Sequence, residues 1–545
     1  MWITDSLTWL WKTTTGLRLP IACNALFGTL QVGTSLSFIW VSKRLVDMAT
    51  GMADGSFVFY AVLMVSCVIC QLSFSAVTKR LETRTEMRMA NKLRRWLFSH
   101  VMTSRWMGRE SMHTGDMLNR MEEDVAVVAN LLCRELPSVW VTLVRLTAAF
   151  VFLLVLDIRL AVILVFIMPL ALLGSRRYVR RMRLLTKEIR TTDSRVQTHL
   201  QENLQHRTLI STLERTGHVV RLLDALQSDL YLLVSRRTDF SIFSRTVVQF
   251  GFAAGYTTAF LWGVYGLWQG TVTFGTVTAF LQLVNQVQRP VVEIGNQLPV
   301  FVHTFIAVER LEELATLEPE QQGAPIRLKG IPGIRLVKVS FSYPDGGRTV
   351  IDGFTHDFRP GSLTAVIGET GVGKSTLMRL LLALLLPDKG KIVFYDTDRE
   401  AVASPLTRCN IVYVPQGNTL LNGTIRDNLL LGNPDATEEE LHRVLHLSVA
   451  DFVHELPDGL DTPCGELGAG LSEGQAQRIS IARGLLRPGG ILLLDEPTSS
   501  LDGETERTLL RRLAEQVRDK TLILVTHKET ASRFCTDTVT LTGNL

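Results

Sequence analysis

The chain has 545 residues, of which 46% are hydrophobic, and a formal net charge of +4. This length exceeds that of a small module and indicates at least two large folding units. The charge is too mild to indicate a nucleic-acid-binding protein, and seven scattered cysteines, an odd number, exclude a disulfide framework.

The N-terminal residues 1–18 predict a helix that lies at a membrane surface. They carry Trp2, Leu7, Leu10 and Trp11, which are suited to the level of the lipid headgroups. A secretory signal has a charged start, then an apolar core and then a cleavage site of small residues. The N-terminal sequence lacks this order, so no secretory signal is visible.

Six apolar segments follow, each of roughly the 20 residues that a helix needs to cross a bilayer. They predict a helical membrane domain over residues 19–315, embedded in the lipid bilayer. The approximate spans are Leu19–Trp40, Phe57–Val77, Val139–Leu156, Leu160–Gly174, Val247–Trp268 and Gly275–Val300.

Two of the connections between spans are long, have helical periodicity and are rich in Arg and Lys. They cover residues 78–137 and 175–246, whereas the other connections are short. Because positive residues beside spans stay on the cytoplasmic side, both long loops and both termini are predicted inside the cell.

Polar residues inside the spans mark either a water-filled cavity or a contact between helices. In the sixth span Gln282, Gln286, Arg289 and Glu293 recur at helical spacing, which places them on one face, expected to line the translocation path, and makes Arg289 and Glu293 able to pair. Arg145 in the third span either faces the same cavity or extends to the inner membrane surface.

A polar linker, residues 316–330, separates the spans from residues 331–545, which alternate short apolar strands with polar helices. The strands are predicted at Leu363–Ile367, Ile411–Val414, Ile491–Leu494 and Thr521–Val525. This pattern is typical of an α/β domain.

The stretch "GETGVGKS", which we term the phosphate loop, follows the first of these strands and precedes a helix predicted to start near Lys374. This is the context of a P-loop, whose backbone N–H groups surround the phosphates of ATP. Lys374 would reach the outer phosphates, and Ser375 would bind Mg²⁺. The residues predicted to contact the nucleotide here are Gly368, Glu369, Thr370, Gly371, Val372, Gly373, Lys374, Ser375 and Thr376.

Two carboxylates end the apolar run "ILLLDEP". Asp495 is predicted to hold Mg²⁺, and Glu496 is predicted to accept a proton from the attacking water. His527 follows another apolar strand and is predicted to contact the γ-phosphate and orient the water.

The ordered set "GETGVGKS", "VPQG", "LSEGQ", "LLLDEPTSSLD" and "VTH" resembles the nucleotide-binding domain of ATP-binding cassette transporters. The first half resembles the exporters of the same family at "HTGDMLNRMEEDV", "VTFGTVTAF" and "AVERLEEL". The resemblance therefore covers nearly the whole chain. Glu473 and Ser500 depart from it, because Gly and Ala are common at these two positions.

This resemblance implies further site residues and a head-to-tail dimer. The signature loop, Leu471–Gln475, would close over the ATP of a partner chain, so that one cassette forms half of two sites. Gln416 would act in catalysis and in metal binding. The residues implied to contact nucleotide are Tyr343, which would stack on adenine, and Ser472, Gly474, Gln475 and Asp502.

Taken together, the expected fold is an α-helical membrane domain with six transmembrane helices and long cytoplasmic helical loops, followed by an α/β P-loop ATPase domain. The resemblance implies a half-transporter in a bacterial cytoplasmic membrane, as a homodimer or a heterodimer with a related chain, with its cassette in the cytoplasm. Turns at Trp106–Glu110 and Gln205–Leu213 would couple cassette to membrane. ATP-driven export of an amphipathic small molecule, lipid or peptide by alternating access is expected; the alternatives are import of a metal chelate and a non-transporting regulator or channel.

Overall fold

The computed structural model describes residue 9 and residues 13–105, 114–163, 175–343, 349–369, 371–464, 470–528 and 532–541. The chain divides into two compact units. The first consists of Met1–Leu97 and Leu118–Leu314, and the second of Phe98–Met117 and Ala315–Leu545. Most of the predicted surface helix at residues 1–18 lies outside the described residues.

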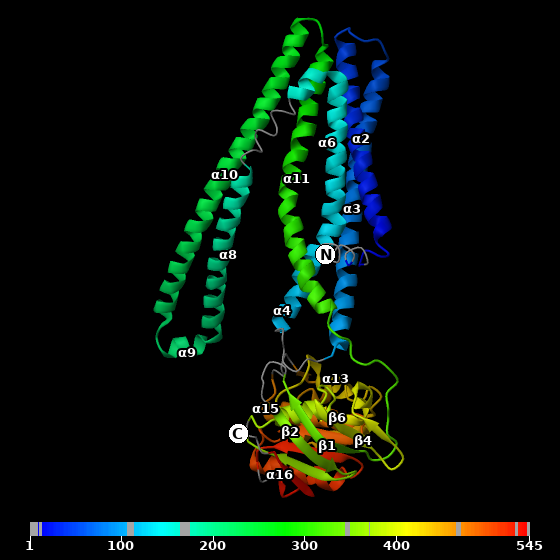
Figure 1. Ribbon diagram of the computed structural model, residues 1–545, viewed down its shortest axis with the longest axis vertical. Helices are drawn as coiled ribbons and strands as arrows, with labels where there is room; N and C mark the ends of the chain where they lie inside the picture. The colour runs from blue at the N-terminus through cyan, green and yellow to red at the C-terminus, as the bar shows by residue number, and fades with distance from the viewer. Residues whose placement is uncertain are drawn as a thin grey trace. The chain divides into compact units, whose positions relative to one another are not determined.

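Long helices make up the first unit (Figure 1). Two short π-helical stretches, η1 and η2, occur within one continuous helical run between residues 114 and 156. The helical elements up to the linker are α2 (Arg18–Ala49), α3 (Phe57–Thr103), α4 (Thr114–Asn119), η1 (Arg120–Asp124), α5 (Val125–Asn130), η2 (Leu131–Glu135), α6 (Leu136–Leu156), α8 (Ser175–Gln205), α9 (Arg207–Thr212), α10 (Thr216–Trp268) and α11 (Phe274–Ala315).

Among the described residues, three helices are long and apolar enough to cross a membrane: α2, α3 and the run Gly115–Leu156. These contain the first three predicted spans. The fifth and sixth predicted spans lie within α10 and α11, which are helical there but are not among those three. The fourth is described only as far as residue 163.

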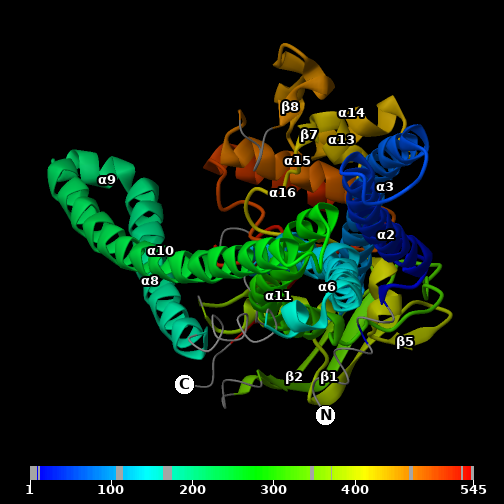
Figure 2. The ribbon, with the colours of Figure 1, turned by 90° about the horizontal axis from the view of Figure 1, so that it is seen from above.

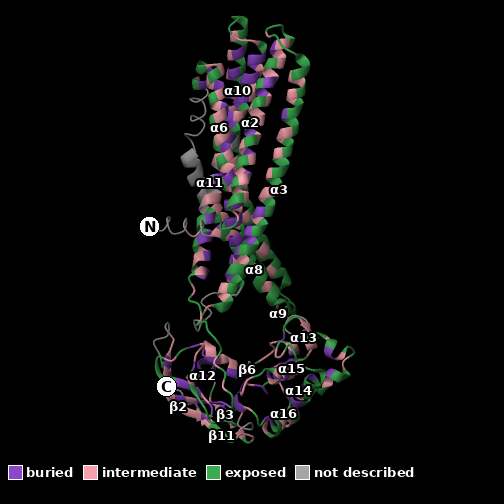
Figure 3. Cartoon of the chain, turned by 90° about the vertical axis from the view of Figure 1, so that its right-hand side faces the viewer, coloured by how far each residue is buried: buried purple, intermediate pink, exposed green. Residues whose placement is uncertain are grey.

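The spans pack closely where a glycine leaves room. A Cβ on Gly28 of α2 would lie 2.4 Å from Val141 of α6, and one on Gly263 of α10 would lie 3.0 Å from Val277 of α11. By contrast, α3 exposes Phe57, which is 59% accessible, and many other apolar side chains. Much of α3 has the colour of exposed residues in Figure 3. Apolar side chains exposed along a predicted span are suited to lipid.

The second long basic connection forms a helical hairpin. Helices α8 and α10 run side by side and are joined through α9 (Figure 1 and Figure 2). The short helix α9 confirms that the predicted turn at Gln205–Leu213 is helical. The other predicted coupling turn, Trp106–Glu110, lies outside the described residues.

The second unit contains an antiparallel sheet with strand order β2-β1-β4-β5 and a parallel sheet with order β11-β3-β10-β9-β6. All four predicted strands are confirmed to within one residue. The strands are β1 (Gly333–Ser342), β2 (Thr349–Phe358), β3 (Leu363–Ile367), β4 (Lys389–Tyr395), β5 (Glu400–Val402), β6 (Ile411–Val414), β7 (Gly423–Thr424), β8 (Pro463–Cys464), β9 (Ile491–Asp495), β10 (Thr521–Thr526) and β11 (Asp537–Thr540).

Both faces of the parallel sheet are buried. Alternate residues of β9 enter two different cores, with Leu493 on one face and Leu492 and Leu494 on the other. This is why the strand reads as a continuous apolar run. The helices of this unit are α12 (Lys374–Leu381), η3 (Pro405–Asn410), α13 (Ile425–Leu430), α14 (Glu438–Leu447), η4 (Asp451–Glu455), η5 (Gly459–Asp461), α15 (Glu473–Leu486) and α16 (Gly503–Gln516).

The linker is fastened within the second unit. Its backbone bonds to the end of α3, from Arg105 N to Glu318 O at 2.8 Å and from Glu320 N to Thr103 O at 2.9 Å. The Glu320 carboxylate accepts two hydrogen bonds from Arg408, at 2.9 and 3.0 Å. Arg408 also donates to the Leu382 carbonyl oxygen, just after α12, at 2.9 Å. We term residues 318–320 the linker strap.

Candidate functional site

The phosphate loop connects the end of β3 to the start of α12. Gly371 and Gly373 have φ angles of +87° and +110°, in the left-handed region that favours glycine. A Cβ on Gly373 would also lie 3.1 Å from Val350. The predicted strand, loop and helix are therefore all present, although Thr370 lies outside the described residues.

The Lys374 side chain folds back along the loop, where its Nζ donates to the Gly368 carbonyl oxygen at 2.6 Å. Ser375 is exposed at the start of α12. Free backbone N–H groups and the helix dipole favour an anion at this end of the helix. The loop thus offers the N–H groups, a cation and a hydroxyl that a triphosphate requires.

Tyr343, the predicted adenine contact, is tied to this helix through its hydroxyl. The oxygen lies 3.2 Å from Thr376 Oγ1 and accepts from Arg379 Nη1 at 3.1 Å. Its ring packs edge-on against Phe341, with centroids 5.0 Å apart. Sequence reasoning missed Arg379, although its position three residues after Thr376 on a helix places both on one face.

Asp495 ends β9 and accepts a hydrogen bond from the Tyr413 hydroxyl at 3.3 Å. Burial raises the pKa of the Asp495 carboxyl above its ordinary value, so the ionised form is not fully compensated by its protein neighbours. A bound cation would provide that compensation. The carboxylate of Asp495, the hydroxyl of Ser375 and the amide oxygen of Gln416 are oxygen donors of the kind that Mg²⁺ prefers, so the residues fit this ion.

Glu496 is held from two sides. Gln416 Nε2 donates to Glu496 Oε2 at 2.9 Å, and His527 Nδ1 lies 3.2 Å from Glu496 Oε1. The Glu496 backbone has φ +44°, an uncommon conformation for a residue with a side chain. Its N–H donates to the Val525 carbonyl oxygen at 2.8 Å. The structure therefore brings three predicted catalytic residues into direct contact.

The signature loop opens α15 with a capping box. The Gln475 N–H donates to Ser472 Oγ at 3.2 Å, and the Ser472 N–H donates to Gln475 Oε1 at 2.9 Å. A Cβ on Gly474 would lie only 2.7 Å from the Ser500 carbonyl oxygen, so this position requires glycine. Ser500 Oγ, at one of the positions that depart from the family pattern, is buried and has no hydrogen-bond partner among the described residues.

Asp502 caps the start of α16. Its Oδ1 accepts from the N–H groups of Thr505 and Glu504, at 3.0 and 3.1 Å. These bonds lower the pKa of the Asp502 carboxyl, which is therefore held ionised.

The predicted site residues thus fall into two groups. One contains the phosphate loop, Tyr343, Asp495 and the contacts of Glu496, and the other contains the signature loop with Ser500 and Asp502. In the described part of the chain, no hydrogen bond or ion pair joins residues 368–376 to residues 471–475.

The polar face of α11 pairs differently from the prediction. Glu293 accepts from Thr142 Oγ1 at 3.3 Å and lies 3.8 Å from Arg145, both on α6. The predicted pairing with Arg289 is not among the ion pairs of the described residues, and the Arg289 side chain is exposed. Contact between helices, rather than spacing along α11, therefore determines the partner of Glu293.

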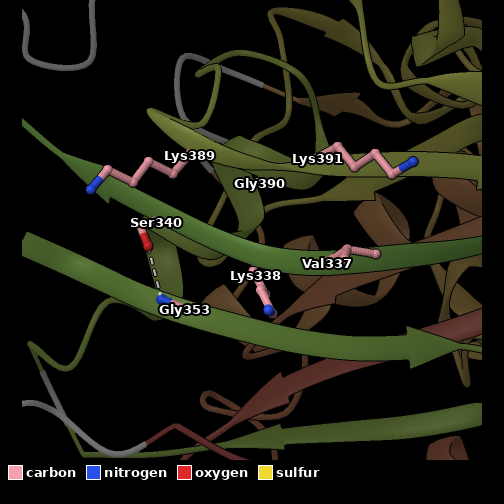
Figure 4. Close-up of a pocket in the computed structure, with 7 residues that line it drawn as sticks. All are labelled: Val337, Lys338, Ser340, Gly353, Lys389, Gly390 and Lys391. Carbon is pink, nitrogen blue, oxygen red and sulfur yellow. Dashed lines mark hydrogen bonds between the residues drawn. The ribbon is translucent and has the colours of Figure 1, made fainter.

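A shallow recess on the antiparallel sheet gathers lysines but does not form an anion site. It is lined by Lys338, Lys389 and Lys391 together with Ser340 and Gly353. The three lysine side chains point away from one another (Figure 4). The recess therefore does not concentrate their charge on a ligand.

Comparison with known proteins covers both units. Residues 21–291 match the family described as "ABC transporter transmembrane region", and residues 351–499 match the family described as "ABC transporter". A candidate multidrug export ATP-binding/permease protein of Bacillus subtilis, YgaD, is 25% identical over 93% of this chain and 90% of its own. The ATP-dependent lipid A-core flippase of Desulfotalea psychrophila is 29% identical over 79% and 76%, respectively.

One solved structure agrees with the fold along nearly the whole chain. It is that of a bacterial Atm1-family ABC exporter with ATP bound, with a TM-score of 0.78. The alignment covers 97% of this chain and 94% of that chain, at 22% sequence identity. At this identity the likeness concerns the fold.

Proposed function

Because the chain belongs to the exporter-type ATP-binding cassette transporters, with the membrane region and the ATPase domain in one polypeptide, we propose that it exports an amphipathic compound by alternating access as a dimer. The expected cargo is a small molecule, lipid or peptide. The proposed location is a bacterial cytoplasmic membrane, with the cassette in the cytoplasm.

The observation that carries the catalytic part of this proposal is the Glu496 carboxylate, held by Gln416 and His527 one residue beyond Asp495. A carboxylate fixed in this way orients a water molecule and accepts its proton as the water attacks the γ-phosphate. Gln416 and His527 are proposed to hold the carboxylate in that position. Mg²⁺, when bound by Asp495, Ser375 and Gln416, supplies charge neutralisation at the phosphates.

The proposed dimer follows from the signature loop. The start of α15 and the small residue Gly474 offer N–H groups to an anion, yet no bond joins this loop to the phosphate loop within the described residues. By analogy with the family to which the chain belongs, we assign Ser472, Gly474 and Gln475 to the ATP bound by a partner chain, with Asp502 as a further contact across the dimer. Closure around two ATP molecules would turn the membrane cavity outward.

Export is tested by reconstituting the purified chain in nanodiscs and measuring which lipids or amphipathic drugs stimulate ATP hydrolysis. A stimulating compound is then followed in proteoliposomes with outward-facing cassettes. We expect ATP-dependent movement of the compound from the cassette side to the opposite side. ATP hydrolysis with movement in the reverse direction would contradict export.

The adenine contact is tested at Tyr343. Tyr343→Ala is expected to raise the KM for ATP by about tenfold, because stacking of a base on an aromatic ring contributes on the order of 1–3 kcal/mol. Tyr343→Phe, which keeps the ring but removes the hydroxyl bonded to Thr376 and Arg379, is the matched control and is expected to change KM by less than about threefold. Equal KM values for the two variants would remove Tyr343 from this role.

A further inference from the structure

A buried carboxylate on α16 connects the two loops that carry the catalytic groups. Glu506 is only 8% exposed, and both of its oxygens are engaged. Oε1 accepts from Thr498 Oγ1 at 2.9 Å, and Oε2 pairs with Lys528 Nζ at 3.0 Å. Lys528 Nζ also donates to the Thr498 carbonyl oxygen at 2.8 Å. We term Thr498, Glu506 and Lys528 the Glu506 network.

Each loop member of the network is close in sequence to a catalytic residue. Thr498 lies two residues after Glu496, and Lys528 directly follows His527. Since Lys528 bonds to the backbone of the first loop as well as to Glu506, the network fixes the distance between the two loops. The contact between Glu496 and His527, 3.2 Å long, lies between these same loops.

The conformation of Glu496 requires such support. A left-handed backbone at a residue with a side chain is unfavourable and persists only where its surroundings hold it. The Ser499 N–H donates to the Glu496 carbonyl oxygen at 3.2 Å, and the Leu501 N–H donates to that of Thr498 at 3.3 Å. Thr498 is therefore the point at which this tight turn is attached to α16 through Glu506.

The same network is attached to the loop that faces the partner chain in the proposed dimer. The Glu506 N–H donates to the Asp502 carbonyl oxygen at 2.9 Å, in the first turn of α16. The Ser500 carbonyl oxygen, in the preceding loop, would lie 2.7 Å from a Cβ on Gly474, so this loop approaches the signature loop closely. A shift of the signature loop or of Asp502 would therefore reach Glu496 and His527 through Glu506.

We propose that Glu506 and Lys528 are positioning residues for ATP hydrolysis. They hold Glu496 and His527 at their contact distance and link them to the loop of Ser500 and Asp502, which faces the partner chain in the proposed dimer. This inference rests on the proposed function, because it assumes that Glu496 is the general base. Neither residue is proposed to contact nucleotide. Their loss should therefore reduce kcat and leave the KM for ATP nearly unchanged.

The test measures ATPase kinetics of the full chain in nanodiscs. Lys528→Ala is expected to lower kcat about tenfold or more, since small misplacements of catalytic groups are costly, with KM within twofold of the wild type. Lys528→Arg, which keeps the charge and the donors, is expected to retain kcat within about threefold. Glu506→Gln, which keeps the shape but not the charge, is expected to fall between them.

A matched control is available on the same helix. Arg512 of α16 forms an ion pair with Asp451 at 3.2 Å, away from both catalytic loops. Arg512→Ala should keep kcat within twofold. It should lower the midpoint of thermal unfolding less than Lys528→Ala does, because its ion pair with Asp451 is partly exposed, whereas loss of Lys528 leaves the buried Glu506 carboxylate without its cation. The double variant Glu506→Gln/Lys528→Ala should be no slower than Lys528→Ala alone, because both changes break one network.

Several outcomes would overturn the inference. These are a kcat of Lys528→Ala within twofold of the wild type, an equal loss in Arg512→Ala, or losses that multiply in the double variant. If Lys528→Ala does not fold, the kcat values of Glu506→Gln and Lys528→Arg are compared instead. The inference then requires that Glu506→Gln be slower than Lys528→Arg. The kcat ratios between variants and wild type report only on ATP hydrolysis. An absence of directed transport would therefore refute the proposed export and leave this inference standing.

Discussion

Glu496→Gln is expected to reduce steady-state ATP hydrolysis by about 10²–10⁴-fold, the usual contribution of a general base. The amide has the shape of the carboxylate and can still accept from Gln416, so the architecture of the site is retained. It cannot take a proton from water. The measurement is phosphate release at saturating ATP and Mg²⁺.

Binding of ATP should survive this change, and the closed dimer should accumulate. We expect retained, slowly exchanging ATP in Glu496→Gln and none in Lys374→Ala, whose ammonium group is proposed to reach the outer phosphates. Crosslinking across the dimer in the presence of ATP would report closure. Normal turnover of Glu496→Gln would remove this residue from its assigned role.

Two changes placed on one chain or on two chains of a mixed dimer should have very different effects. If the signature loop serves the partner, Ser472→Arg on one chain and Lys374→Ala on the other disable the same composite site, and the second site stays intact. With both changes on one chain, both sites are disabled. We expect roughly half of wild-type ATPase activity in the first arrangement and almost none in the second.

The mixed dimers can be isolated with two different affinity tags, and each site can be followed by trapping of a labelled nucleotide on a tagged chain. Dimers with a single Ser472→Arg chain serve as the control for any effect of one site on the other. The opposite ranking, with the two-chain arrangement inactive and the one-chain arrangement half active, would show that the signature loop serves its own chain.

Much of the cassette could be predicted because its local signals and its packing agree. The strands β3, β6, β9 and β10 are buried on both faces, so they read as unbroken apolar runs whose ends are sharply defined. The phosphate loop needs glycines with left-handed backbones followed at once by a helix, and both requirements are visible in the sequence.

The pairings of side chains could not be predicted, because they depend on how elements are rotated against one another. Spacing along one helix suggested Arg289 as the partner of Glu293, but the rotation of α6 against α11 provides Arg145 and Thr142 instead. Likewise, Gln416 is 80 residues from Glu496 in sequence, and only the parallel pairing of β6 with β9 brings the two together.

The linker strap ties the last turn of α3 to the second unit. Residues 318–320 are bonded both to the last turn of α3 and, through Arg408, to the residues that follow α12. The terminal turn of α3 and the start of the linker therefore belong to the same compact unit as the cassette. The chain passes between the two units at three places, which are Leu97–Phe98 in α3, Met117–Leu118 in α4 and Leu314–Ala315 in α11.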